Sequence, residues 1–203
     1  MYTHEPVMEL DRGKQARFLG IWLGNRKPIK DTKDRIKGEI NTITTALRKK
    51  KVTDKHILYI LNRVLIPRIE FRMQHCHLNW NVCNYLTIAY RKLLKNKAMI
   101  SGTMPNSVIH HKKFYGLKSI WQIQTESQIT NLVHRLNDPG PAGLSTIIRL
   151  KQGQIKNWEP TNILEDGIPP NFDCKGNFTA TILRNANELG LEIRNWKWAK
   201  IFS

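Results

Sequence analysis

Acidic residues are missing from the middle of this sequence. No aspartate or glutamate occurs in the 55 residues between Glu70 and Glu126, which hold 8 lysine and arginine residues. Protein surfaces normally mix both signs of charge, because a field of one sign repels itself. The chain has a net charge of +17, and residues 31–120 carry +13 of it. This localised excess indicates a polyanionic partner, of which nucleic acid is the commonest.

Cysteine and long apolar runs are also scarce. The three cysteines, Cys76, Cys83 and Cys174, show no disulfide-scaffold spacing and indicate a reducing compartment. Apolar runs are only a few residues long, which excludes a membrane span. The first residues include acids where a secretory signal has cations. We therefore expect a soluble, intracellular protein with no membrane partner, in either the nucleus or the cytoplasm.

The usual signatures of catalysis and metal binding are lacking as well. The sequence has no Asp-Asp pair, no glycine-rich phosphate loop and no nucleophile elbow. His75, Cys76, His77 and Cys83 are candidate zinc ligands, but three of them are adjacent and no second ligand pair follows. Small buried cysteines and surface histidines are the better interpretation. We expect no catalytic residue, no metal site and no cofactor.

The order of apolar residues predicts a mainly α fold, with a short β-hairpin before the first helix. Residues 17–23 (RFLGIWL) are apolar and aromatic and lead into a turn, which is typical of a strand. Thereafter the apolar spacing becomes helical, with capping residues at several expected starts. The expected helices begin at residue 31 or 32, at Thr53 with an interruption at Pro67, at about 81, at about 119, at about 143 and at about 178.

Several cations are expected on exposed surfaces. A helix over 81–97 would bury Leu86 and Leu93 and place Arg91 and Lys95 on its opposite face. Lys49–Lys51 either complement the dipole of the preceding helix or contact phosphates, and the two readings are compatible. His110–Lys113 are either a phosphate-binding patch or a solvated turn. Three aromatic residues are either core or stacking platforms for bases: Trp22, Trp80 and Tyr115.

Four segments also occur in an informative order: RFLGIWL at 17–23, VLIPRIEFR at 64–72, YRKLLKNK at 90–97 and FYGLKSI at 114–120. Together they resemble the end of the palm and the helical thumb of reverse transcriptases from non-LTR retrotransposons. Phe18, Leu19 and Gly20 match the primer grip, a β-hairpin that holds the 3′ end of the primer. The second segment has Phe71 where this family usually has tyrosine, and the fourth has one of its two glycines. The resemblance covers roughly residues 15–137.

The resemblance implies a helical thumb-like bundle with three regions along the chain. These are a palm-end β element at 1–30, a thumb-like domain at 31–137, and a connector with a C-terminal helical segment at 138–203. In this family the catalytic aspartates lie upstream of the Phe-Leu-Gly strand and hold the magnesium ions. We therefore expect a truncated, non-catalytic fragment of an RNA-directed DNA polymerase, with magnesium bound only if another chain supplies the missing palm.

The expected activity is binding of RNA or an RNA–DNA duplex through its phosphates. The residues expected to bind are Lys49, Lys50, Lys51, Arg68, Arg72, Arg91, Lys92, Lys95, Lys112 and Lys113. Two alternatives stay open. In the first, the chain is a helical protein–protein interaction module whose basic face binds an acidic protein. In the second, it is a decayed retroelement remnant with no selected function.

Overall fold

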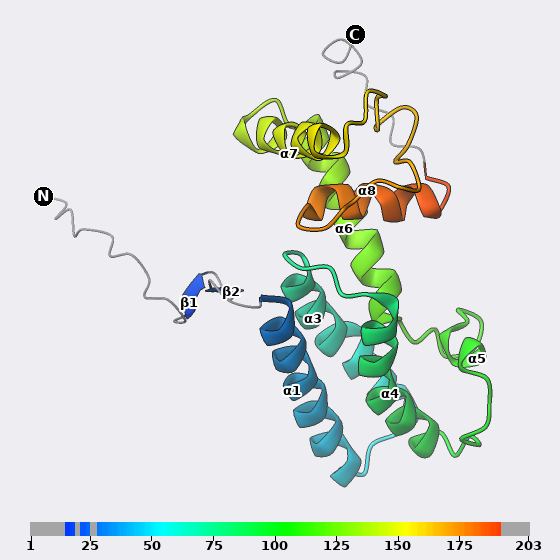
Figure 1. The fold of residues 1–203 in the computed structure, drawn as a ribbon. Coiled ribbons are helices and arrows are strands. Elements are labelled where there is room, and N and C mark those ends of the chain that lie inside the picture. Colours follow the sequence, from blue (N-terminus) through cyan, green and yellow to red (C-terminus); the bar gives the residue numbers. More distant parts are fainter. Residues whose placement is uncertain (1–14, 19–20, 25–27, 192–203) are drawn as a thin grey trace, which may run out of the picture. The chain divides into compact units, whose positions relative to one another are not determined.

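The structure is a computed structural model that describes residues 15–18, 21–24 and 28–191. Helices dominate these residues, which confirms the predicted mainly α class (Figure 1). Two segments of four residues, β1 (Gln15–Phe18) and β2 (Ile21–Gly24), pair antiparallel, with Gln15 opposite Gly24 and Phe18 opposite Ile21. They form no larger sheet within the described residues, so their interpretation as a palm remnant stays a prediction.

The chain divides into two compact units. The N-terminal unit consists of residues up to Leu78 together with Tyr85–Leu117, and the C-terminal unit of Asn79–Asn84 together with the residues from Lys118 onward. Helix α6 (Ile120–Asn137) therefore belongs to the C-terminal unit, whereas the sequence grouped it with the thumb-like domain. The physical reason is that Leu132 and Leu136 of α6 pack into the core of that unit.

The N-terminal unit is built from α1 (Pro28–Lys49), α2 (Asp54–Ile60), the π-helical turn η1 (Leu61–Leu65), α3 (Ile66–Met73), α4 (Trp80–Lys97) from Tyr85 onward, and α5 (Asn106–His110). Thr53 caps α2 as predicted, since its side chain accepts a hydrogen bond from the backbone N–H of His56. Helices α1 and α4 run in the same direction (Figure 1). Lys37 lies over the ring of Tyr85 in the first half of the two helices, and Lys97 donates to the backbone oxygen of Lys50 at their ends.

The stretch from α2 to α3 is one helical rod in which a π turn accommodates Pro67. Proline lacks an N–H and disrupts a regular α-helix, and an extra residue in the preceding turn relieves that conflict. Ile66 is buried, and the other buried residues of the rod repeat every fourth position: Ile57, Leu61, Leu65, Ile69 and Met73. A period of four drifts around a regular α-helix, and the wider π turn corrects this drift. Val64, whose spacing from Ile57 and Leu61 would fit the apolar face of a regular α-helix, is exposed for this reason.

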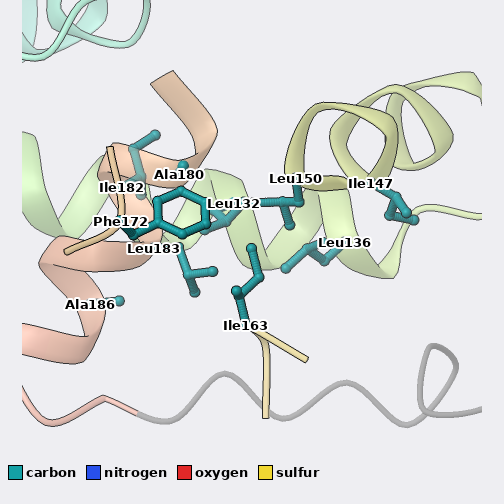
Figure 2. Close-up of a cluster of buried hydrophobic side chains, with 10 residues drawn as sticks. All are labelled: Leu132, Leu136, Ile147, Leu150, Ile163, Phe172, Ala180, Ile182, Leu183 and Ala186. Carbon is teal, nitrogen blue, oxygen red and sulfur yellow. The ribbon is translucent and has the colours of Figure 1, made fainter. Parts of the chain in front are cut away.

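The C-terminal unit packs α6, α7 (Pro141–Asn157) and α8 (Phe178–Glu188) around one apolar cluster (Figure 2). The cluster contains Leu132, Leu136, Ile147, Leu150, Ile163, Phe172, Ala180, Ile182, Leu183 and Ala186. The segment between α7 and α8 adds Ile163 and Phe172 to this core.

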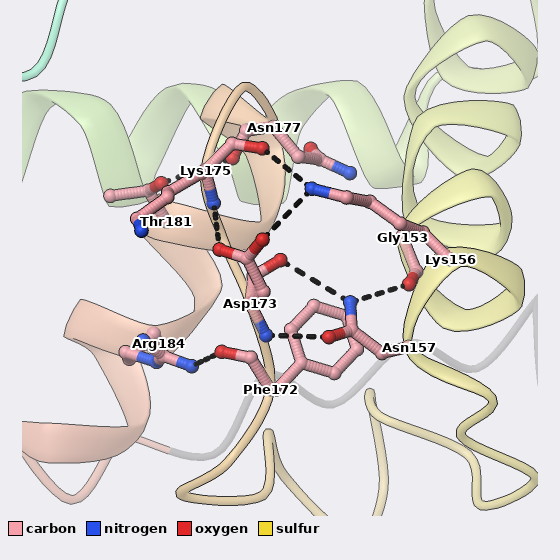
Figure 3. A network of polar contacts seen from close by, with 9 residues as sticks. All are labelled: Gly153, Lys156, Asn157, Phe172, Asp173, Lys175, Asn177, Thr181 and Arg184. Carbon is pink, nitrogen blue, oxygen red and sulfur yellow. Dashed lines mark hydrogen bonds and ion pairs between the residues drawn. The ribbon is translucent and has the colours of Figure 1, made fainter.

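Polar contacts fasten that segment to the helices (Figure 3). Lys156 forms an ion pair with Asp173 at 2.9 Å, and Asn157 donates from its side chain to the backbone oxygen of Asp173. Asn177 caps α8 and also donates to the backbone oxygen of Arg149 at 2.7 Å. These contacts give residues 158–177 a defined path although they contain no long helix or strand.

Candidate nucleic-acid interface

The two units differ sharply in charge. Among the described residues, the N-terminal unit has 19 lysines and arginines against 5 acids, whereas residues 118–191 of the C-terminal unit have 7 of each. Except for Lys118, the excess charge that the sequence places in residues 31–120 thus belongs to a single compact unit. A polyanion would be attracted to this unit and not to the other.

One cationic cluster forms where α1 ends. Arg48, Lys49, Lys50 and Lys51 are all exposed around the end of this helix. Lys97, at the last residue of α4, donates from Nζ to the backbone oxygen of Lys50 at 2.7 Å. This hydrogen bond brings a fifth cation from a distant part of the chain to the same place.

A second cationic segment is fixed beside the start of α2. Tyr115 donates from its hydroxyl to Asp54 Oδ2 at 2.7 Å, and Asn62 donates from Nδ2 to the backbone oxygen of Gly116 at 3.0 Å. The turn before Tyr115 is also closed internally, because the N–H groups of Phe114 and Gly116 both donate to the oxygen of His111. This ordered turn carries Lys112 and Lys113, which are exposed.

We call the resulting surface the basic junction. It consists of Arg48, Lys49, Lys50, Lys51, Lys55, Lys97, Lys112 and Lys113. Asp54 is the one acid within the segments 48–55 and 111–115, and the hydrogen bond from Tyr115 lowers the pKa of its carboxyl group. The same bond raises the pKa of the Tyr115 hydroxyl. Sequence reasoning found Lys49–Lys51, Lys112 and Lys113, but missed Arg48, Lys55 and Lys97.

Lys95 is not on this surface or on any exposed face. Its side chain is buried, at 7% relative exposure, and its Nζ donates to the backbone oxygens of Gly102 at 2.9 Å and Met104 at 2.7 Å. The prediction of an exposed Lys95 is wrong because the chain after α4 folds back over this side of the helix. Lys95 holds that loop.

The remaining predicted cations of α3 and α4 differ in their ion pairs and in their exposure. Arg72 pairs with Glu39 Oε1 at 2.7 Å, and Arg68 lies 3.7 Å from the same oxygen, so one carboxylate of α1 faces both arginines. Arg91 is half-buried, and burial lowers the pKa of its guanidinium. Burial also lowers the pKa of the His110 imidazole, and the charge of Arg91 lowers it further. Lys92 is exposed, as predicted.

A groove runs between α1 and α4. Lys37, Ile40 and Asn41 line it from α1, and Tyr85, Leu86, Ile88, Ala89 and Lys92 line it from α4. Its volume is about 220 Å³. The groove combines an apolar floor, two lysines and no acidic side chain. No local pattern in the sequence indicates this groove, because the groove depends on which faces of two distant helices meet.

The remaining sequence predictions concern the primer-grip-like segment, the candidate zinc ligands and a membrane span. Phe18 ends β1, while Leu19 and Gly20 of the primer-grip-like segment lie outside the described residues. Cys76 and Cys83 are buried, and no three His, Cys, Asp or Glu residues gather in a metal-binding arrangement within the described ranges. In the same ranges, no helix has the length and apolar character that crossing a membrane requires.

No protein-family model matches this sequence, and neither a curated protein nor a solved structure matches it.

Proposed function

We propose that the N-terminal unit binds the phosphate backbone of nucleic acid, as the thumb of a reverse transcriptase-like protein would, and that the basic junction is its contact surface. The observation that carries the proposal is the junction itself. Two hydrogen bonds, from Lys97 to Lys50 and from Tyr115 to Asp54, bring together cations from three parts of the chain. An ordered set of cations with one acid among them suits a phosphate backbone.

The proposal also assigns a role to the β1–β2 pair. It is the remnant of a polymerase palm, in which Phe18, Leu19 and Gly20 position a primer without taking part in chemistry. The sequence contains no Asp-Asp pair, so magnesium-dependent nucleotide transfer would need a palm from another chain. The proposed activity of this chain is therefore binding, and RNA or an RNA–DNA duplex is the proposed ligand.

The strength of binding should depend steeply on salt. Each phosphate neutralised by a lysine or arginine releases counterions, and log K falls with log salt by about 0.9 per contact on a B-form duplex. If five or six junction cations make contacts, we expect a slope of about −4.5 to −5.4. Such contacts give affinity and register but little sequence specificity.

The test is a titration of the chain against a fluorescent, blunt RNA–DNA duplex at several salt concentrations. We expect Lys112→Glu with Lys113→Glu to weaken binding about tenfold or more and to reduce the slope by about 2. The matched control is Arg135→Glu with Arg149→Glu, which makes the same change in net charge on exposed residues of the C-terminal unit, within the electroneutral range 118–191.

Three results would overturn the proposal. The first is no binding at low salt, and the second is an equal loss in the control variant, which would make net charge the cause. The third is displacement of the duplex by an acidic protein at much lower concentration than by heparin. That last outcome would favour a protein–protein interaction module.

A further inference from the structure

The groove between α1 and α4 has the properties of a small binding site. Ile40 and Leu86 are buried at its floor, while Tyr85 is 50% exposed at its edge. Lys37 and Lys92 are exposed on opposite helices, and Asn41 adds an amide that can both donate and accept hydrogen bonds. The groove therefore offers an aromatic face, cations and a polar amide within one cavity.

The ring of Tyr85 already attracts a cation. Lys37 Nζ lies 5.5 Å from its centroid, which is a cation–π arrangement. At exposed sites this interaction is weak, and stacking of a nucleobase on an aromatic ring in single-strand binders is stronger. A base could therefore take the ring face and leave Lys37 to pair with the phosphate of the same nucleotide.

The groove also leads to the basic junction. The two helices that form it, α1 and α4, end at Lys49 and Lys97, which belong to the junction. Lys37 lies about three helical turns before Lys49, a rise of about 18 Å at 1.5 Å per residue. A strand whose duplex phosphates lie on the junction can therefore continue as a single strand along the groove.

We propose that this groove binds one unpaired nucleotide of a single-stranded extension, with its base against Tyr85 and its phosphate on Lys37 or Lys92. The inference rests on the proposed function and adds a preference for duplexes that carry an overhang. The cavity of about 220 Å³ is smaller than the ~300 Å³ at which pockets for drug-sized ligands begin. It therefore suits one base, and a longer segment would have to remain outside.

The experiment compares a blunt RNA–DNA duplex with the same duplex carrying a short single-stranded overhang that contains 2-aminopurine. We expect the overhang to tighten binding about tenfold, within the range of about five- to hundredfold that base stacking supplies, and to quench the 2-aminopurine fluorescence. Tyr85→Leu should abolish both effects and leave blunt-duplex binding unchanged, and Tyr85→Trp should restore them. Tyr59→Leu is the matched control, because Tyr59 is 65% exposed on α2 and does not line the groove.

The outcomes separate this inference from the proposed function. Equal binding of blunt and overhanging duplexes would overturn the groove site and leave backbone binding intact. An overhang preference that Tyr59→Leu removes as fully as Tyr85→Leu would also overturn it. So would an acidic helical peptide that displaces the overhang from the groove more effectively than a single-stranded oligonucleotide does, since the groove would then belong to a protein partner. Failure of the blunt duplex to bind would instead overturn the proposed function.

Discussion

Replacing Lys95 by methionine should destabilise the N-terminal unit without weakening nucleic-acid binding. Lys95 lies in the acid-free part of the sequence, yet its Nζ points to the backbone oxygens of Gly102 and Met104 and its side chain is buried. Methionine keeps most of the aliphatic stem and packs flexibly in its place. The substitution therefore removes the two hydrogen bonds and the charge while largely preserving the packing.

The expected loss of unfolding free energy depends on whether water can replace the ammonium group at the two backbone oxygens. A hydrogen bond from a charged donor contributes about 1.5–3 kcal/mol. Gly102 is exposed and Met104 half-buried, so water can reach the vacated acceptors, and the buried ammonium already costs desolvation. We therefore expect Lys95→Met to cost about 2 kcal/mol in total. Lys95→Ala should cost about 4 kcal/mol, because it also removes about three buried methylene groups at about 0.8 kcal/mol each.

Urea unfolding followed by circular dichroism measures the loss. A cost of about 2 kcal/mol with a slope near 2 kcal/mol per molar should lower the midpoint by about 1 M. Titration with the blunt duplex should show an unchanged salt slope, whereas Lys50→Gln, at the basic junction, should reduce it by about 0.9. Unchanged stability together with a reduced slope for Lys95→Met would refute the structural role of Lys95.

Two further predictions concern a glycine and a tyrosine. Gly143→Ala should destabilise the C-terminal unit by about 3 kcal/mol in thermal unfolding, because its Cβ would lie 2.0 Å from the backbone oxygen of Asp138. Gly38→Ala, an exposed helical control with nothing within 4 Å of the added Cβ, should stabilise by about 0.5–1 kcal/mol, and an equal loss in both variants would contradict the steric argument. Tyr115→Phe should remove a stabilisation that depends on pH, because the hydrogen bond lowers the pKa of Asp54. The stability difference from the wild type should be full above about pH 4, the ordinary range of an aspartate, and should shrink as the pH falls through the lowered pKa; a difference that stays constant in acid would refute it.

Local signals in the sequence were sufficient to predict much of the helical framework. The cap at Thr53 and the helix over about 81–97 are both present, the latter as α4. Helix α6 also ends at Asn137, just before Pro139, Gly140 and Pro141, which disfavour a continuous helix. These features have local causes, such as a capping side chain or a missing N–H, so they can be recognised from the sequence alone.

Helix faces were harder to predict because they depend on what packs against them. In α7 the apolar residues Leu144, Ile148 and Ile155, which have the spacing of an apolar helix face, are exposed. The buried side instead includes Gly143 and Gly153, where Phe172 and the backbone of Asp138 approach closely. Small residues that admit a close neighbour carry little hydrophobic signal, so a search for apolar stripes passes over them.

Backbone carbonyl groups explain why an acid-free stretch overstates a cationic surface. Carbonyl oxygens in loops and after helix ends carry partial negative charge and require donors. Lys95 donates to two such oxygens, so its buried ammonium group is satisfied without any acidic partner. Counting acids along the sequence cannot detect this. A lysine is available to a polyanion when its own segment is held by other contacts, as Tyr115 holds the turn that carries Lys112 and Lys113. The basic junction, and not the face of α4, therefore carries the proposed function.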